Sequence, residues 1–181
     1  MERLVILDRD GVINRDSAAF IKSPSEWQPL PGSLEALRLL HQHDYRVAVA
    51  SNQSGIARGL LSESTLQAIH QRMCEQVAEA GGQIAAIHYC PHAPEAHCRC
   101  RKPQPGLLLA IAERFRVALA SVPFVGDRPS DLAAATAAGA RPVLVRSGHG
   151  QQCAAELPAG HSVAIYDDLL AFARQLTHSR Q

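Results

Sequence analysis

Near the start of the chain, residues 3–12 read RLVILDRDGV, an apolar run that leads directly into two carboxylates. A short apolar run of this kind predicts a strand buried on both faces of a sheet. Asp8 and Asp10 would then lie at the tip of that strand, where Gly11 permits a sharp turn. Paired carboxylates in this place suit a nucleophile and a general acid. An Asp-rich turn that caps a helix is the less favoured alternative, because an apolar strand runs straight into the acids.

The rest of the chain alternates short apolar runs with segments of helical period. Further strands are expected at residues 46–50, 84–89, 122–125, 142–145 and 162–165. Helices are expected at residues 33–43, 62–80, 106–115, 130–138 and 167–177, with Ser33 as the N-cap of the first and Ser62 at the start of the second. This alternation predicts an α/β fold: a doubly wound, mainly parallel, Rossmann-like sheet with helices on both faces. In such sheets, ligands bind at the carboxyl ends of the strands, near a topological switch point.

Length and composition set the class of protein. The chain has 181 residues, of which 46% are hydrophobic and 19% charged, as expected for a single soluble domain over residues 1–181. The formal net charge is +1, without a run of like charges, which argues against a nucleic-acid partner. The apolar stretches are too short to span a membrane, and the first residues lack the apolar region of a signal peptide. We therefore expect a cytoplasmic monomer without a nucleic-acid or membrane partner.

Polar clusters follow four of the expected strands, and parallel strands would bring these clusters to one edge of the sheet. The first contains Asp8 and Asp10, the second is Ser51-Asn52-Gln53-Ser54-Gly55, the third ends in Arg101-Lys102-Pro103, and the fourth contains Gly126-Asp127-Arg128 and Asp131. Asp8 and Asp10 repel each other, so a cation is needed between them. Asp127 offers further oxygen ligands, and an all-oxygen site suits Mg²⁺. Asp131 could cap the following helix, hold Lys102 or lie near the metal.

A segment rich in Cys and His occupies residues 90–103 and has no periodicity. The five cysteines of the chain form an odd count without a signal peptide, which argues against a disulfide framework. Cys90, His92, Cys98 and Cys100 offer a Cys₃His set, which is typical of structural Zn²⁺. Reduced free cysteines are the alternative, and His97 could compete with His92 as the fourth ligand. A closed set of four ligands would fix the loop and orient the basic residues that follow it.

The four clusters together resemble, in order, the signatures of the haloacid dehalogenase superfamily of phosphatases. Asp8-Arg9-Asp10-Gly11-Val12 resembles the first signature, Ser51 the second, Lys102 the third, and Gly126-Asp127 with Asp131 the fourth. The resemblance implies an aspartyl-phosphate intermediate, with Asp8 as nucleophile and Asp10 as general acid and then base. It implies that Asp8, the backbone carbonyl of Asp10 and Asp127 hold Mg²⁺. Ser51, Asn52 and Lys102 would bind the phosphoryl group in transfer, with Ser51 and Lys102 acting in catalysis.

Three longer stretches narrow the resemblance: LDRDGVIN (7–14), SNQSGIARG (51–59) and CPH…CRCRKPQPG (90–106). They resemble D-glycero-D-manno-heptose 1,7-bisphosphate phosphatases, and histidinol phosphate phosphatases share the pattern. The resemblance implies removal of the C7 phosphate from a small sugar bisphosphate, in the synthesis of nucleotide-activated heptose for the lipopolysaccharide core. The substrate contacts that it implies are Asn52, Gln53, Ser54, Arg58, Arg101 and Arg128. Ser51 stands where Thr is usual, and Arg128 where Lys is common, which keeps the charge but changes its geometry.

Other functions remain open at this point. A histidinol phosphate phosphatase would use the same chemistry in a different pocket. A nucleic-acid 3′-phosphatase would need more positive charge than the chain carries. A non-catalytic, zinc-stabilised binding module would have no need of the full set of Asp8, Asp10, Lys102 and Asp127.

The spacing of the clusters leaves room for only a minimal cap beside the zinc-binding loop, so the site should be open. Residues 16–20 could line its mouth. Other side chains are expected to have no functional role. By default, Arg9, Arg15 and Arg146 are expected to be surface arginines, and Trp27 and Cys74 to be packing residues. Cys153 is assigned no role.

Overall fold

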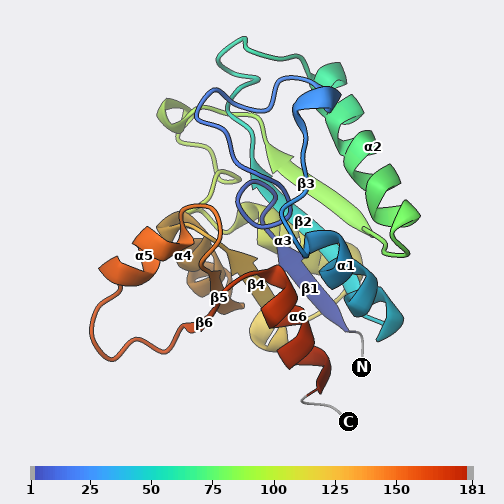
Figure 1. The fold of residues 1–181 in the computed structure, drawn as a ribbon. Helices are drawn as coiled ribbons and strands as arrows, with labels where there is room; N and C mark the ends of the chain where they lie inside the picture. Colours follow the sequence, from blue (N-terminus) through green and yellow to red (C-terminus); the bar gives the residue numbers. More distant parts are fainter. Residues whose placement is uncertain (1–2, 179–181) are drawn as a thin grey trace.

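The computed structural model describes residues 3–178 and contains one parallel sheet of six strands in the order β3-β2-β1-β4-β5-β6 (Figure 1). The strands are β1 (Leu4–Leu7), β2 (Arg46–Asn52), β3 (Ala86–Cys90), β4 (Pro123–Gly126), β5 (Arg141–Val145) and β6 (Ala164–Tyr166). Every neighbouring pair is parallel. The chain builds outward from β1 to β3, then returns to the other side of β1 with β4. This confirms the predicted doubly wound sheet and puts the switch point between β1 and β4.

The register of the central strands brings their carboxyl ends to one edge. Leu7 is level with Val49 of β2 and with Val125 of β4. β1 ends at Leu7 and β4 ends one residue beyond Val125, whereas β2 continues to Asn52. Because the three strands are parallel, the segments that follow them leave the sheet at the same edge. The amide of Asp8 still donates to the carbonyl of Val125, at 2.9 Å, so the first polar residue after β1 remains fixed to the sheet.

Helices cover both faces of the sheet (Figure 1). One face carries α1 (Ser33–Gln42), α2 (Glu63–Glu79) and α6 (Leu169–His178); the other carries α3 (Gly106–Phe115) and α4 (Pro129–Ala138). The alternation of side chains along β1 explains the two layers. Val5 and Leu7 belong to the core under α1, α2 and α6, whereas Leu4 and Ile6 belong to the core under α3 and α4. A strand buried on both faces needs both sets to be apolar, as the sequence has them.

The helix starts agree with the sequence in one case and differ in the other. Ser62 is the N-cap of α2, as expected, and its Oγ accepts from the amide of Thr65 at 3.1 Å. Ser33 was expected to be the N-cap of α1, but Gly32 takes that position with a φ of 76°. Ser33 is the first helical residue, and its hydroxyl donates to the carbonyl of Leu30. A left-handed residue at the cap suits glycine, which explains the shift.

One short helix was not expected, α5 (Gly150–Glu156). It presents a single deeply buried side chain, Cys153, which packs on Leu132 and Leu144 near the β6 edge of the sheet. One buried residue gives too little periodicity for a helix to be recognised in the sequence. Short 3₁₀ turns occur at Pro24–Glu26, Pro94–Ala96 and Leu119–Ser121. Within residues 3–178, none of the helices has the length and apolar character that crossing a bilayer would require.

Candidate active site

Asp8 lies at the carboxyl end of β1, beside the switch point, and is held there by a buried lysine. Lys102 Nζ donates to Asp8 Oδ1 at 2.8 Å and lies 2.6 Å from Asp131 Oδ1. All three side chains are almost fully buried. Burial opposes the charge of Lys102, but Asp131 and Asp8 outweigh it and raise the pKa of the lysine. The lysine is therefore a fixed positive charge at the tip of β1.

The pKa of Asp8 itself is raised, because its burial outweighs the attraction of Lys102 and because Asp131 and Asp127 add negative charge nearby. Three carboxylates share this small space: one oxygen from each of Asp8, Asp127 and Asp131 lies within 4.8 Å of the others. One ammonium group does not balance three acids. The site thus favours an additional cation.

Asp127 follows β4 and has an oxygen suited to that cation. Its Oδ2 accepts from the amide of His149 at 2.8 Å, whereas its Oδ1 is buried without a hydrogen-bond partner. Burial raises the pKa of Asp127 to about 6. A side chain at Gly11 or Gly148 would collide with this carboxylate, which explains why glycine stands at both positions. A buried, unpartnered carboxylate oxygen beside Asp8 fits a hard cation such as Mg²⁺.

Asp131 is not equivalent to the other two acids. Its Oδ2 accepts hydrogen bonds from the amides of Asp127 and Arg128, both at 3.1 Å, and so caps the start of α4. Its Oδ1 faces Lys102. Of the roles left open in the sequence, the structure shows two, the helix cap and the contact with Lys102.

Asp10 is held by three side chains, two residues beyond Asp8. Arg9 makes a forked contact, with Nη2 at 2.9 Å and Nε at 3.1 Å from Asp10 Oδ1. Asn14 Nδ2 also donates to Oδ1, and Gln53 Nε2 donates to Oδ2, each at 2.9 Å. Burial alone would raise the pKa of Asp10, but Arg9 and these hydrogen bonds prevail and lower it. Arg9 Nη2 also donates to Oδ2 at 3.1 Å, so Oδ1 accepts three donors and Oδ2 accepts two. Oδ2 is therefore the less occupied oxygen and the better candidate to carry a proton.

The loop after β2 connects the other parts of the site. Gln53 Nε2 also donates to Ser51 Oγ at 2.7 Å, which links Asp10 to the end of β2. The side chain of Asn52 exchanges two hydrogen bonds with the backbone of Lys102, both 3.0 Å long. This pair fixes the segment that carries Lys102. Gln53 and Asn52 line the cavity, and their side-chain amides hydrogen-bond to other groups of the protein.

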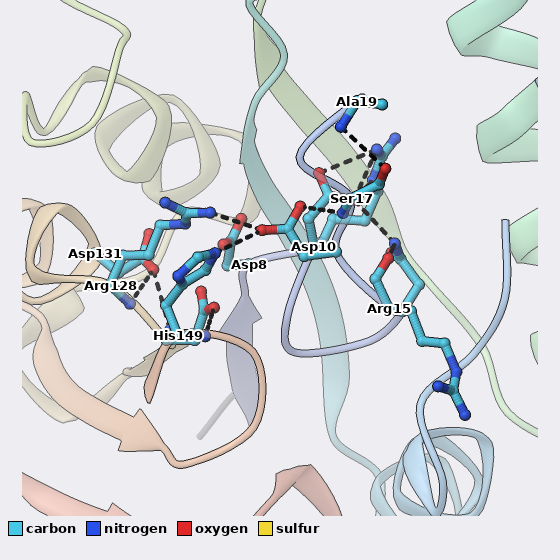
Figure 2. Close-up of polar contacts among 12 residues, drawn as sticks. Asp8, Asp10, Arg15, Ser17, Ala19, Arg128, Asp131 and His149 are labelled. Atoms are coloured by element: carbon cyan, nitrogen blue, oxygen red, sulfur yellow. Dashed lines mark hydrogen bonds and ion pairs between the residues drawn. The ribbon is translucent and has the colours of Figure 1, made fainter. Parts of the chain in front are cut away.

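A cavity of about 910 Å³ opens above these residues. Six basic residues line it: Arg9, Arg15, Arg101, Lys102, Arg128 and His149. Asp16 lies between two of them, with its Oδ2 at 2.6 Å from Arg128 Nη2 and 3.1 Å from His149 Nε2. Figure 2 shows Arg128, Asp131 and His149 on one side of Asp8, and Arg15 and Ser17 on the other.

Residues 16–20 line the mouth, as expected, through Asp16, Ser17, Ala18 and Phe20. They form a turn closed by its own hydrogen bonds (Figure 2). The amide of Phe20 donates to the carbonyl of Ser17 at 3.0 Å, and Phe20 has a φ of 65°. The segment is thus a small turn at the cavity, held mainly by hydrogen bonds among its own residues.

The structure brings most of the residues that the sequence predicts to one place. Asp8, Asp10, Asn52, Gln53, Ser54, Arg101, Lys102 and Arg128 line the cavity, with Ser51 and Asp127 buried directly behind. Arg58 does not line the cavity, and its side chain is exposed. The default reading of Arg9 as a surface arginine is wrong, because only 1% of it is exposed. Trp27 is a core residue, as expected.

Four ligand atoms converge in the loop after β3: Cys90 Sγ, His92 Nδ1, Cys98 Sγ and Cys100 Sγ. The sulfur–sulfur distances are 3.2–3.5 Å, and His92 Nδ1 lies 3.3 Å from Cys100 Sγ. A tetrahedron with zinc–sulfur bonds of about 2.3 Å has edges of about 3.8 Å, so these atoms need to move apart only slightly. The competing ligand, His97, is not among the four. The donor set fits structural Zn²⁺.

The thiols of this cluster differ in acidity. Burial raises the pKa of Cys90 to about 12. Burial also opposes ionisation of Cys98, but the amide of Arg101 and the neighbouring thiols lower the pKa of Cys98 to about 6. One ligand is therefore prepared as a thiolate before any cation arrives. Arg101 also donates from Nη1 to the carbonyl of His92 at 3.2 Å, which connects the cluster to the cavity wall.

Two residues of the site carried no recognisable signal in the sequence: His70 and His149. Asn14 ends the stretch 7–14 that carries the family resemblance, and Asp16 begins the segment expected to line the mouth, although neither was assigned a specific contact. His149 and His70 lie far along the chain, on segments without a motif. Only the fold brings them to the site.

Comparisons with known proteins agree with this geometry. The HAD-hydrolase-like family model matches residues 99–172. A D-glycero-β-D-manno-heptose-1,7-bisphosphate 7-phosphatase of Pseudomonas putida is 52% identical over 174 residues, which cover 96% of this chain and 99% of that protein. A protein of the same name from Bordetella bronchiseptica is also 52% identical, over 96% of this chain and 97% of its own length.

Solved structures show the same similarity. The D,D-heptose 1,7-bisphosphate phosphatase of B. bronchiseptica, complexed with magnesium and phosphate, has a TM-score of 0.93 at 51% identity, over 98% of this chain and 99% of that one. The phosphatase of that name from Burkholderia thailandensis has a TM-score of 0.77 at 42% identity, over 97% and 98% of the two chains. The chain therefore belongs to the D-glycero-D-manno-heptose-1,7-bisphosphate 7-phosphatase family of the haloacid dehalogenase-like (HAD) hydrolases.

Proposed function

We propose that this enzyme removes the C7 phosphate of D-glycero-β-D-manno-heptose 1,7-bisphosphate through a phosphorylated Asp8. The observation that carries the proposal is the group at the tip of β1: Asp8 fixed by the buried Lys102, with Asp10 two residues further on. Relatives 52% identical over almost the whole chain are named for this reaction, and their names specify the β anomer. The reaction fits the supply of heptose for nucleotide-activated precursors of the lipopolysaccharide core.

In the first step, an oxygen of Asp8 attacks phosphorus while the bond between phosphorus and the C7 oxygen breaks. Asp10 Oδ2 gives its proton to the departing oxygen, so the sugar leaves as a neutral alcohol. Lys102 lies beside Asp8 and neutralises charge that gathers on the phosphoryl oxygens. Ser51 Oγ, held by Gln53, offers a further hydrogen bond to that group.

In the second step, water attacks the phosphorylated Asp8. Asp10 Oδ2, now unprotonated, takes a proton from the water as it attacks phosphorus. The bond between phosphorus and the Asp8 oxygen breaks, which releases phosphate and restores both carboxyl groups. The lowered pKa of Asp10 suits this role as a base, because Arg9 and Asn14 stabilise its charged form. The same shift opposes the protonated form that the first step needs, and the negative charge of a bound phosphate would act in the other direction by raising the pKa of Asp10.

Asp8, the backbone carbonyl of Asp10 and Asp127 are proposed to hold Mg²⁺. The unpartnered Oδ1 of Asp127 and the excess of carboxylates support this set. The ion supplies charge neutralisation for the phosphoryl group in transfer. Asp131 stays outside the set because both of its oxygens already face donors of the protein.

Cys90, His92, Cys98 and Cys100 are proposed to hold a structural Zn²⁺ that fixes residues 90–103. The converging donor atoms and the acidic thiol of Cys98 support this site. Four protein ligands leave no open position for a substrate, so the ion would stabilise the loop that presents Arg101 and Lys102.

The basic residues around the cavity are proposed to bind the rest of the substrate. Arg101 and Arg128 reach the cavity from opposite loops, so they can contact the phosphate that is not transferred. Ser54 lines the same wall and could contact a sugar hydroxyl. The exposed position of Arg58 removes the support for its predicted contact.

We also propose that the enzyme is monomeric. Among residues 3–178, Leu60 and Leu109 are the large apolar side chains that are clearly exposed, and they lie on different elements. A large apolar interface is therefore not visible on this part of the chain. Light scattering after size exclusion would test this, and cell fractionation would test the cytoplasmic location.

The function is tested by phosphate release with Mg²⁺ from five substrates: both anomers of heptose 1,7-bisphosphate, histidinol phosphate, fructose 1,6-bisphosphate and a 3′-phosphorylated oligonucleotide. We expect the β-heptose substrate to have the highest kcat/KM. Faster cleavage of histidinol phosphate or of the oligonucleotide would refute the substrate. Asp8→Asn should abolish turnover, and a variant that still forms product would refute the covalent mechanism.

A further inference from the structure

Arg9 is buried between Asp10 and a histidine from a distant helix. Only 1% of Arg9 and 7% of His70 are exposed. His70 belongs to α2 and lies 61 residues further along the chain, yet its Nε2 is 3.3 Å from Arg9 Nη1. The steps proposed above need Asp10 and use Arg9 to stabilise its charged form, but they assign nothing to His70.

The guanidinium of Arg9 uses its separate edges for different partners. Its Nε and Nη2 donate to Asp10, and Nη2 also lies 3.3 Å from Gln53 Oε1. Nη1 points the other way, towards His70. Because a guanidinium is planar and rigid, holding Nη1 fixes the orientation of the fork that grips Asp10.

His70 can accept this hydrogen bond only as a neutral ring. The structure favours that form, because burial and the charge of Arg9 lower the pKa of His70 to about 3. With Nε2 as the acceptor, the ring proton is on Nδ1. The ring also packs against Tyr89 of β3, with centroids 5.8 Å apart, which limits its movement.

We propose that His70 is a positioning residue for the proton transfer at Asp10 Oδ2, acting through Arg9. This inference rests on the proposed function, since it concerns the same proton. Gln53 and Asn14 hold Asp10 from other directions, so losing His70 would loosen the carboxyl rather than release it. In the loosened state, the proton still passes from Oδ2 to the departing oxygen, but from a poorer geometry.

The test compares two kinds of leaving group. An alkyl phosphate needs a proton on its departing oxygen, whereas p-nitrophenyl phosphate releases a stable phenolate without one. The value of kcat/KM reports only the steps up to loss of the alcohol, so it isolates the acid function of Asp10 from its later function as a base. The alkyl substrate is the member of the panel above that the wild-type enzyme cleaves fastest.

His70→Leu removes the acceptor but keeps the volume of a side chain in the core. We expect kcat/KM for the alkyl phosphate to fall about 10-fold, and that for p-nitrophenyl phosphate less than about twofold. His70→Gln, which offers an amide oxygen in place of Nε2, should restore the alkyl value to within about threefold. Met73→Leu, a buried change one turn further along α2, is the matched control and should leave the ratio of the two substrates unchanged.

If His70→Leu lowers kcat/KM by the same factor for both substrates, the proposal is overturned, because the effect would indicate a merely structural role. If a folded His70→Leu keeps both kcat/KM values at the wild-type level, the proposal is overturned as well. If His70→Leu does not fold, His70→Asn is compared with His70→Gln instead. The shorter amide of Asn should reach Arg9 less well, so His70→Asn should show the larger loss of kcat/KM for the alkyl substrate. Failure of the proposed function would look different: wild-type enzyme would prefer another member of the panel, while the two-substrate comparison would still report on His70.

Discussion

Replacing Asp127 with Asn should make the protein more stable when magnesium is absent, although it should abolish the predicted metal site. Burial raises the pKa of this carboxyl from 3.8 to about 6. Asn has the same shape and retains an oxygen for the amide of His149. The change therefore removes a buried negative charge that lacks a full set of partners, and little else.

The magnitude follows from the shift in pKa. The folded protein binds the Asp127 proton more tightly than the unfolded chain does, so its stability falls as the pH rises from about 4 to about 6 and then stays level. At 1.36 kcal/mol per pKa unit, the charge costs about 1 kcal/mol at pH 4.5 and about 3 kcal/mol at pH 8. Asp127→Asn should recover these amounts. Titrating groups that do not interact with Asp127 cancel in the difference. Asp8 does not, because the charge of Asp127 raises its pKa, and relief of that effect adds to the gain in the variant.

The assay is urea unfolding at pH 4.5 and pH 8 in magnesium-free buffer, without a chelator that would strip the Cys/His cluster. Magnesium at 100 times its dissociation constant should then stabilise wild type by about 2.7 kcal/mol, and Asp127→Asn by much less. Asp131→Asn is the control with the opposite sign. It removes the negative partner 2.6 Å from Lys102 and should destabilise the protein at pH 8 by about 1–3 kcal/mol.

Two results would refute this reasoning. One is an Asp127→Asn protein that is no more stable than wild type at pH 8 without magnesium. The other is a gain of the same size at both pH values, since a gain independent of pH cannot come from the titration of this carboxyl.

Three other substitutions test separate parts of the site. Lys102→Met should lower kcat/KM for phosphate release at least about 100-fold, and should lower stability in urea by about 3 kcal/mol at pH 8, because Asp8 and Asp131 lose their buried cation. Asn52→Ala removes both hydrogen bonds to the Lys102 backbone and should lower kcat about 10-fold with a smaller effect on KM, as measured by steady-state kinetics. Cys100→Ser should reduce the zinc content measured by mass spectrometry and lower the calorimetric Tm by at least about 5 °C.

Each of these three predictions has an outcome that would contradict it. Lys102→Met with activity within threefold of wild type would remove the lysine from the mechanism. An Asn52→Ala protein that changes KM alone would show that Asn52 contacts the substrate and does not hold the loop. Full zinc content in Cys100→Ser would mean that the cluster is not the zinc site.

The sheet could be predicted because its strands are short, apolar and regularly interrupted. Leu4–Leu7 is apolar on both faces, which happens only where helices cover both sides of a strand. The elements after β5 were harder to predict from the sequence. α5 buries one side chain deeply, and β6 is three residues long at the edge of the sheet, so neither gives a strong pattern. The predicted strand at residues 162–165 accordingly begins two residues before β6.

The catalytic candidates could be found because they stand directly after strands, where the register of a parallel sheet determines their meeting place. Asp8 and Asp127 are of this kind. The side chains that support them could not be found in the same way. His70 lies on the buried face of a helix, where a lone histidine normally reads as a core residue. Arg58 follows a strand-end cluster in sequence, but the turn after β2 carries it outward.

The turn of residues 16–20 has a consequence for how this enzyme could diversify. Its hydrogen bonds close on themselves, and its contact with the opposite wall runs through Asp16 to Arg128 and His149. Changes of length or composition there would reshape the entrance without disturbing Asp8 or Lys102. A duplicated gene could therefore acquire a new substrate by altering a few codons of this segment, while the inherited reaction stayed intact.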